Sequence, residues 1–248
     1  MPIPSPWTGD DLAELPETVQ RYLHAMGGVN RPRDWSVRAH ITGRFRPRGH
    51  GPWMFAQVWQ YNGVVEVCRF FHMRIDFAGV VPMVGRDIYL RGKGIMHGRL
   101  LGLVTVARSE GPETDLIELA THLDDAVLMA PSTLLRPDVS FGPADDRAFD
   151  VSLVGAGQTL TARVFLDVDG RPANSSTTDR YADLPGGLVR AEWSTPIDGW
   201  QPDGDHFIFT HGSAIWELPE GPLNYLDFPM SAGGVRYNQA PSDITFES

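Results

Sequence analysis

From residue 36 onward, most of the chain consists of short runs in which apolar and polar residues alternate. Residues 36–45 (SVRAHITGRF) and 54–62 (MFAQVWQYN) are two such runs, and a short turn separates them. Successive side chains of a strand point to opposite faces of a sheet, so this alternation predicts half-buried strands. Runs joined by short turns favour antiparallel neighbours over a parallel sheet with crossover helices.

The stretch from Arg86 to Arg108, RDIYLRGKGIMHGRLLGLVTVAR, combines strand-forming residues with repeated glycines. An isolated glycine within a strand marks a bulge, a bend or a place where another backbone comes close. We therefore expect two strands around a glycine-rich bend, interrupted by Gly92, Gly94, Gly98 and Gly102.

Two segments have the 3.6-residue period of an amphipathic helix. Residues 16–26 (PETVQRYLHAM) end at Gly27-Gly28, and residues 114–130 (TDLIELATHLDDAVLMA) are followed by Pro131. Thr114 or Asp115 is expected to cap the second helix. Glu118, His122 and Asp125 share one face of that helix, which we expect to be solvated because it lies opposite the apolar stripe.

These patterns predict a mainly β fold. We expect an antiparallel curved sheet, forming a half-barrel or a closed barrel, with a short N-terminal helix and one mid-chain helix packed on or plugging the sheet. The expected organisation is an N-terminal helical arm (1–35), a single antiparallel β domain (36–240) containing helix 114–130, and a loose C-terminal tail (241–248).

Composition excludes several partners. The formal net charge of -10 argues against nucleic acid or an anionic membrane, both of which need clustered Lys and Arg. The single cysteine, Cys68, excludes an intramolecular disulfide and is expected to be a buried apolar residue. No apolar run approaches the ~20 residues of a membrane span, and the N-terminus does not read as a signal peptide. We expect a cytoplasmic protein without an integral membrane segment.

The common catalytic motifs are missing. The sequence has no G-x-S-x-G elbow, no P-loop, no H-E-x-x-H pair and no G-x-G-x-x-G that opens a helix after a strand. No reaction and no cofactor can be assigned, and ligation of a haem or a divalent metal by one of the eight histidines stays open. A homodimer also stays open.

The first functional hypothesis is the binding of a small hydrophobic or lipid-like molecule in an apolar pocket. Twelve Phe, seven Trp and six Tyr supply many bulky side chains for the interior of a barrel. The residues expected to line such a pocket are Arg44, Trp59, Tyr61, Phe71, Met96, Leu123, Trp193 and Trp216.

The alternative is a cytoplasmic enzyme that acts on a small apolar substrate, either by acid–base chemistry or with a haem or metal. His97, His122 or Asp125 would serve as acid or base, and Arg99 or Arg44 would hold a carboxylate or oxyanion. His97 is expected to be half-buried, because its neighbours are apolar. A third hypothesis is a structural module without a ligand.

Four segments carry a resemblance to a known family. They are LPETVQRYLHAMGGVNRP, GRFRPRGHGPWMFAQVWQY, GRDIYLRGKGIMHGRLLGLVTVARSEGPETDLIELATHL and IWELPEGPLNY. On these segments, which cover most of the chain, the sequence resembles a widespread, uncharacterised bacterial family of unknown function. The resemblance implies no activity and supplies no catalytic residues.

The expected architecture is also similar to that of lipoprotein-carrier half-barrels. In those proteins a curved antiparallel sheet wraps a helix over an apolar ligand groove. This is a similarity of fold, which by itself does not transfer a function.

Overall fold

The computed structural model describes residues 5–46, 51–77, 81–101, 103–155, 157–184 and 186–241. Within them, one antiparallel sheet runs in the order β6-β5-β4-β3-β2-β1-β16-β15-β13-β10-β9-β8-β7, while β14 pairs with β15 and β17 with β1. Strands β11 and β12 form a separate hairpin. In the described residues β6 and β7 do not pair with each other, so the predicted antiparallel curved sheet is confirmed in its open form.

The strands of the first half of the chain are β1 (Ser36–Phe45), β2 (Met54–Gly63), β3 (Cys68–Phe77), β4 (Val81–Leu90), β5 (Lys93–Leu100) and β6 (Val104–Glu110). The next group is β7 (Val139–Ala144), β8 (Ala148–Gly155), β9 (Gln158–Leu166), β10 (Pro172–Thr177), β11 (Tyr181–Leu184) and β12 (Gly187–Arg190). The last group is β13 (Glu192–Ser194), β14 (Ile197–Asp203), β15 (His206–Leu218), β16 (Gly221–Pro229) and β17 (Val235–Tyr237).

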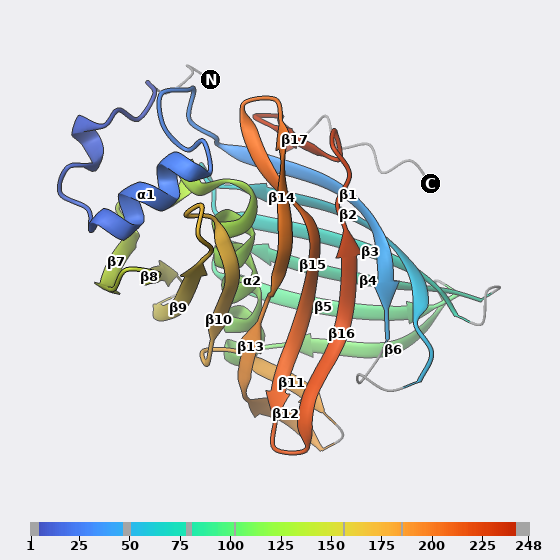
Figure 1. Ribbon diagram of the computed structural model, residues 1–248. Coiled ribbons are helices and arrows are strands. Elements are labelled where there is room, and N and C mark those ends of the chain that lie inside the picture. Colours follow the sequence, from blue (N-terminus) through green and yellow to red (C-terminus); the bar gives the residue numbers. More distant parts are fainter. Residues whose placement is uncertain are drawn as a thin grey trace.

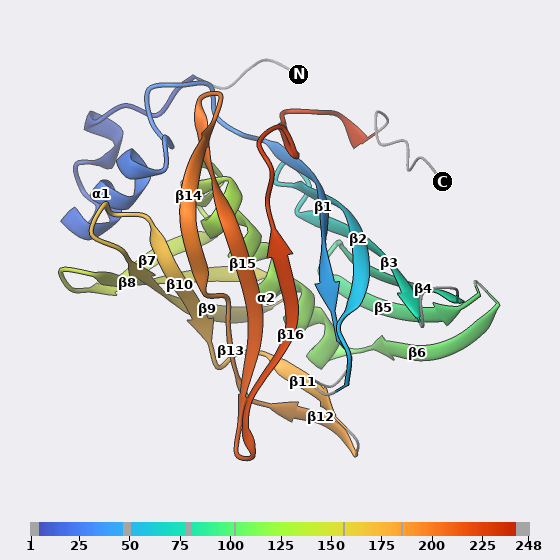
Figure 2. The same cartoon turned by 45° about the vertical axis from the view of Figure 1, so that its right-hand side comes forward.

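In the described residues the helices are α1 (Glu17–Ala25) and α2 (Pro112–Met129), together with the 3₁₀ segments η1 (Asp10–Leu12) and η3 (Pro131–Leu134). Figures 1 and 2 show α2 inside the curve of the sheet, α1 beside β7 and β8, and the β11–β12 hairpin near one end of β13, β15 and β16. Tyr22 of α1 is fully buried and donates a hydrogen bond of 2.8 Å to the carbonyl oxygen of Val127. The N-terminal helix thus shares one core with α2.

Helix α2 is buried on nearly all sides, which corrects the expectation of a solvated polar face. Glu118 and His122 are each 1% exposed, and Asp125 points at the sheet, where it accepts hydrogen bonds. The helix is enclosed by the sheet, so both its apolar stripe and its polar face have protein neighbours. Periodicity alone could not reveal this enclosure.

The start of α2 also differs from the prediction. The helix begins at Pro112 after Gly111, whose φ is 114°, and no side chain caps it. Asp115 instead accepts a 2.7 Å hydrogen bond from the backbone N–H of Gly94 on β5. The predicted capping side chain therefore holds the helix against the sheet.

The glycine-rich stretch contributes to three strands, the end of β4, all of β5 and most of β6, where two were expected. Turns with positive φ at Arg91, Gly92 and Leu101 divide it. A Cβ atom at Gly94 would lie 2.4 Å from the carbonyl oxygen of Thr114, so only glycine lets β5 come this close to α2. The register between β5 and β6 shifts after Gly98, which is the predicted bulge. Gly102 and the tail from residue 242 lie outside the described residues.

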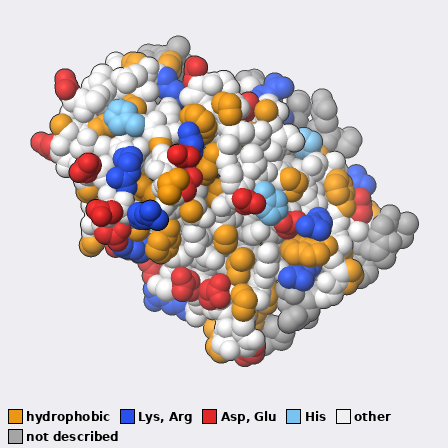
Figure 3. All heavy atoms as spheres, in the orientation of Figure 1, with side chains coloured by type: hydrophobic (Ala, Val, Ile, Leu, Met, Phe, Trp, Pro, Cys, Tyr) orange, Lys and Arg blue, Asp and Glu red, His pale blue; other side chains and the backbone are white. Residues whose placement is uncertain are grey.

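None of the helices in the described ranges is long and apolar enough to cross a membrane. On the face shown in Figure 3, acidic and basic side chains are interspersed among small groups of hydrophobic ones.

Candidate functional site

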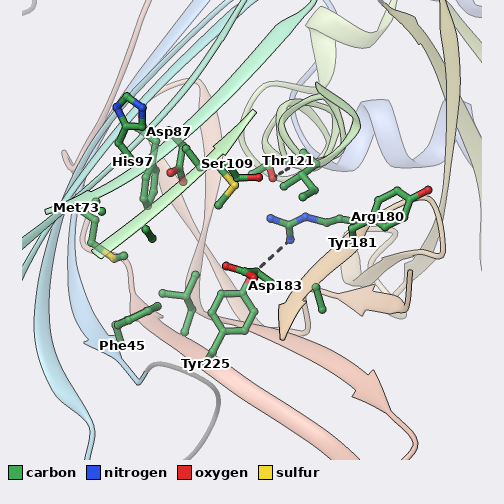
Figure 4. Close-up of a pocket in the computed structure, with 18 of the residues that line it drawn as sticks. Phe45, Met73, Asp87, His97, Ser109, Thr121, Arg180, Tyr181, Asp183 and Tyr225 are labelled. Carbon is green, nitrogen blue, oxygen red and sulfur yellow. Dashed lines mark hydrogen bonds between the residues drawn. The ribbon is translucent and has the colours of Figure 1, made fainter. Parts of the chain in front are cut away.

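A cavity of about 350 Å³ lies between the inner face of β3–β6, the first turns of α2, the β11–β12 hairpin and strands β13, β15 and β16. Its lining is mostly apolar and aromatic, with a few charged or hydroxyl side chains (Figure 4). The volume lies at the lower end of the range of about 300–1,000 Å³ typical of small-molecule sites. The apolar lining includes Phe45, Phe71, Met73, Ile75, Met83, Met96, Ile117, Leu188, Trp193, Trp216, Leu223 and Leu226.

Two neighbouring cross-strand rows explain why this space is open. One row, Phe71–Asp87–Met96–Ser109, supplies side chains of ordinary size across four strands. The next row consists of Met73, Gly85, Gly98 and Ala107. Three of its four positions carry little or no side chain, so the sheet leaves a hollow there.

The opposite wall is aromatic. Trp193 of β13 and Trp216 of β15 are paired across the strands with ring centroids 6.5 Å apart. The Nε1–H of Trp193 donates a 3.0 Å hydrogen bond to the hydroxyl oxygen of Tyr225 on β16, and Phe45 meets the Tyr225 ring edge-on. These contacts fix the orientation of the rings that face the hollow.

A buried ionic network lies beside the cavity, between β3 and α2. Arg69 donates from Nη1 to Glu118 and from Nε to Asp125, each at 2.9 Å. Asn62 donates a further 2.9 Å hydrogen bond to Asp125. Burial works against the charged guanidinium, but Asp125 and Glu118 outweigh it and raise the pKa of Arg69. The arginine is therefore charged and ion-paired with two carboxylates.

Two carboxyl groups in and beside this network, Glu118 and Asp87, have raised pKa values because they are buried. Burial, with the added repulsion of Asp87, raises the pKa of Glu118 to about 7. Burial also raises the pKa of Asp87, with Arg69 and Arg180 acting in the opposite direction. Glu118 can therefore hold a proton close to neutral pH, where an exposed carboxyl is ionised.

Arg180, in the segment between β10 and β11, is a second buried arginine that lines the cavity. It is 8% exposed, and its guanidinium carbon lies 3.8 Å from the ring centroid of Trp193. Its Nη1 donates a 3.4 Å hydrogen bond to the Tyr225 hydroxyl. Figure 4 shows Asp87 and Arg180 on opposite sides of the cavity.

Four of the residues expected to line a pocket do meet in this cavity: Phe71, Met96, Trp193 and Trp216. His97 lies at its border, but the ring points away from its centre (Figure 4) and is 35% exposed beside Glu110. Arg99 does not line the cavity but lies with Arg86 in a smaller, neighbouring depression, which His97 also borders.

The remaining lining candidates lie elsewhere. Trp59 packs between His40 and His72 on the outer face of the sheet. Tyr61 shares that face, where its hydroxyl donates a 3.3 Å hydrogen bond to the carbonyl oxygen of Gln239. Arg44 pairs with Asp227, and Leu123 belongs to the packed core.

His122 and Asp125 lie on α2, inside the sheet, whereas His97 and Arg99 lie at or beyond its outer face. The four proposed catalytic side chains are therefore not brought together. Burial, reinforced by the positive charges of Arg136 and Arg69, lowers the pKa of His122 to about 3. In the described part of the chain, no three His, Cys, Asp or Glu side chains are grouped to hold a metal ion.

Sequence reasoning missed Arg69, Asp87, Arg180 and Tyr225. A signal existed for Arg69, because alternation places it on the same face of its strand as Phe71 and Met73. An arginine on an otherwise apolar face needs a buried partner. Arg180 carried no such signal, since it lies between strands.

Comparison with known proteins assigns the chain to a family without assigning an activity. A search of curated proteins found no match. A solved LolA superfamily protein, NE2245 from Nitrosomonas europaea, is 12% identical, with a TM-score of 0.46 over 92% of this chain and 96% of that one. The model of DUF6544, a family of unknown function, matches residues 5–228, and the chain therefore belongs to that family.

Proposed function

We propose that this protein binds a small hydrophobic, lipid-like molecule in the cavity between β3–β6 and the Trp193–Trp216 wall. The observation that carries the proposal is the row of Gly85, Gly98 and Ala107, which leaves a hollow in an otherwise well-filled interior. Protein interiors are normally close-packed, so a hollow of this size lined by apolar groups favours a ligand.

The stabilisation expected from such a ligand comes from its apolar surface. Each square ångström of apolar surface removed from water contributes roughly 25 cal/mol, before the cost of immobilising the ligand. The fixed aromatic rings of the wall limit that cost on the protein side, because they are already held by the contacts of Tyr225. The binding is proposed without any chemical conversion of the ligand.

Titration of the purified chain with the uncharged fluorescent probe N-phenyl-1-naphthylamine tests the proposal. Saturable binding with about one site per chain is expected. A Cβ atom at Gly85 would meet only Met73, at 3.8 Å or more, so larger side chains can be introduced there and will point into the cavity. The series Gly85→Ala, Gly85→Leu and Gly85→Phe should weaken the probe progressively.

Ile88→Phe serves as the matched control. Ile88 lies three residues along the same strand but does not line the cavity, so its enlargement should leave probe affinity unchanged. Binding that does not saturate, or that is equally strong in the Gly85→Phe and Ile88→Phe variants, would contradict the proposal.

A further inference from the structure

We propose that the ligand is an anionic amphiphile, a long-chain carboxylate, whose head is held by Arg180 and Tyr225 while its apolar chain fills the hollow along Gly85, Gly98 and Ala107. This inference rests on the proposed function, since it names the chemical class of the molecule bound at that site.

The first observation is that Arg180 is buried without a counter-ion. In the part of the chain that the structure describes, no carboxylate lies within 4.0 Å of its guanidinium. Its Nε is buried and has no hydrogen-bond partner there, and the contact to Tyr225 is long at 3.4 Å. A buried charge without a partner is costly, so its retention beside a cavity points to an anion supplied by a ligand.

None of the nearby carboxyl groups that the structure describes serves as a counter-ion for Arg180. Glu118 and Asp125 are both bound to Arg69. Asp87 lies on the opposite wall, and Asp183 of β11 is exposed. Arg180 influences Asp87 and Glu118 only through its longer-range charge. The donors of Arg180 therefore remain available from the cavity side.

The second observation concerns the hydroxyl of Tyr225. Its oxygen accepts hydrogen bonds from Trp193 Nε1 and from Arg180 Nη1. A phenol oxygen accepts about two hydrogen bonds and donates one, so the proton of Tyr225 is left for a further acceptor. The tyrosine and the guanidinium thus present donors side by side. A carboxylate, with two oxygens, matches a guanidinium edge and a neighbouring hydroxyl.

The third observation is that these donors are held in place before any ligand arrives. The Arg180 guanidinium stacks over Trp193 at 3.8 Å and lies 5.2 Å from the ring centroid of Trp216. The carbonyl oxygen of Arg180 accepts a 3.2 Å hydrogen bond from the N–H of Ala191. The planar guanidinium of arginine stacks on aromatic faces, which the compact ammonium group of lysine does less well. The site is preorganised for a planar, two-point contact.

Competition against N-phenyl-1-naphthylamine at pH 8 tests this inference with three ligands of equal chain length: dodecanoate, 1-dodecanol and dodecylamine. The wild-type chain should bind dodecanoate at least tenfold more tightly than dodecanol, and dodecylamine least. Arg180→Gln should weaken dodecanoate by about 10- to 100-fold, as expected for a charge-assisted contact, and change dodecanol less than threefold. Tyr225→Phe should weaken dodecanoate by a smaller factor.

Arg74→Gln is the matched control. Arg74 lies on β3, but it is half exposed and pairs with Asp76, so its loss should not alter the preference for dodecanoate. Arg180→Lys keeps the charge and loses the planar contact, so an intermediate affinity is expected. If Arg180→Gln does not fold, Arg180→Lys and Tyr225→Phe test the same donors separately.

The outcomes separate the inference from the proposed function. Equal affinity of the wild-type chain for dodecanoate and dodecanol would overturn the carboxylate assignment while leaving apolar binding intact. Tighter binding of dodecylamine would also overturn it and would point to Asp87 as the head-group partner. Absence of probe binding altogether would remove the proposed function and the inference with it.

Discussion

Two buried arginines lie within the same interior and differ in their polar partners. Arg69 is bound by two carboxylates, and Asn62 supports one of them. Arg180 stacks on tryptophans and has no carboxylate partner in the described residues. A closed network of this kind holds elements together, whereas an open donor set costs stability until something fills it. The two arginines thus separate the part of the interior that holds a closed ionic network from the part that we propose binds a ligand.

The largest effect expected from the contrast between the two arginines is the loss of stability on replacing Arg69. Arg69→Met would leave Glu118 and Asp125 buried without a counter-charge, so we expect the free energy of unfolding to fall by about 3–5 kcal/mol. Urea denaturation at pH 7.5 measures this change. Neutralising both acids in the triple variant Arg69→Met, Glu118→Gln, Asp125→Asn should restore a large part of the loss. A single-variant loss below about 1 kcal/mol would show that the network has no structural role.

The same contrast is expected between two apolar side chains. Leu123 is 1% exposed within the packed core, so Leu123→Ala should cost about 2–5 kcal/mol. Met96 borders the existing hollow, and Met96→Ala should cost clearly less, while it changes probe affinity. Thermal and urea unfolding of both variants give the comparison. Equal costs would mean that the wall at Met96 is as tightly packed as the core.

A third expected effect concerns Asp124, next to the paired Asp125. Burial and the neighbouring Asp125 raise the pKa of Asp124 to about 7, although Thr195 donates a 2.9 Å hydrogen bond to it. Between about pH 4 and pH 7 the folded chain therefore holds a proton that the unfolded chain has lost. The stabilisation from this group is present below the unfolded pKa and is lost as the pH rises through about 7.

Asp124→Asn removes this titration and keeps an oxygen for Thr195. The stability of the wild type relative to the variant should therefore decrease from pH 4 to pH 8 by about 2 kcal/mol, with a ceiling of ~4 kcal/mol. His122 titrates in both proteins, so its contribution cancels in the difference. Urea unfolding across the pH range measures the trend, and a difference that stays constant would exclude the raised pKa.

The smallest expected effect is on the stability of the Arg180→Met variant. The substitution removes an unpaired buried charge and a stacking contact at once, and these changes oppose each other. We expect the free energy of unfolding to change by less than about 1 kcal/mol, in contrast to Arg69→Met. A loss of 3 kcal/mol or more in urea denaturation would place Arg180 with Arg69 among the structural charges.

The strands could be read from the sequence because alternation is a local property. Residues 36–45 form a strand where the pattern places it, and the glycine-rich stretch is β-structured as expected, although it contributes to three strands and not two. Alternation groups Trp59 with Tyr61 on one face, but it does not say which face is inside. The inner face of β2 carries Gln60 and Asn62, because there it meets the polar network of Arg69. The prediction that Trp59 lines the pocket is therefore wrong, because Trp59 lies on the outer face of the sheet.

The sequence by itself determined the mainly β class, the two main helices and four of the cavity residues, since each depends on the period of apolar side chains along a short segment. Only the tertiary structure decided which charged side chains are buried and which partners they have. Glu118 and Asp125 lie on the helix face that looked solvated, and only the curvature of the sheet brings Arg69 to them. Arg180 reaches the cavity from a segment between strands. The role proposed for it depends on the lack of a carboxylate partner among the described residues, and a missing spatial neighbour leaves no trace in a linear pattern.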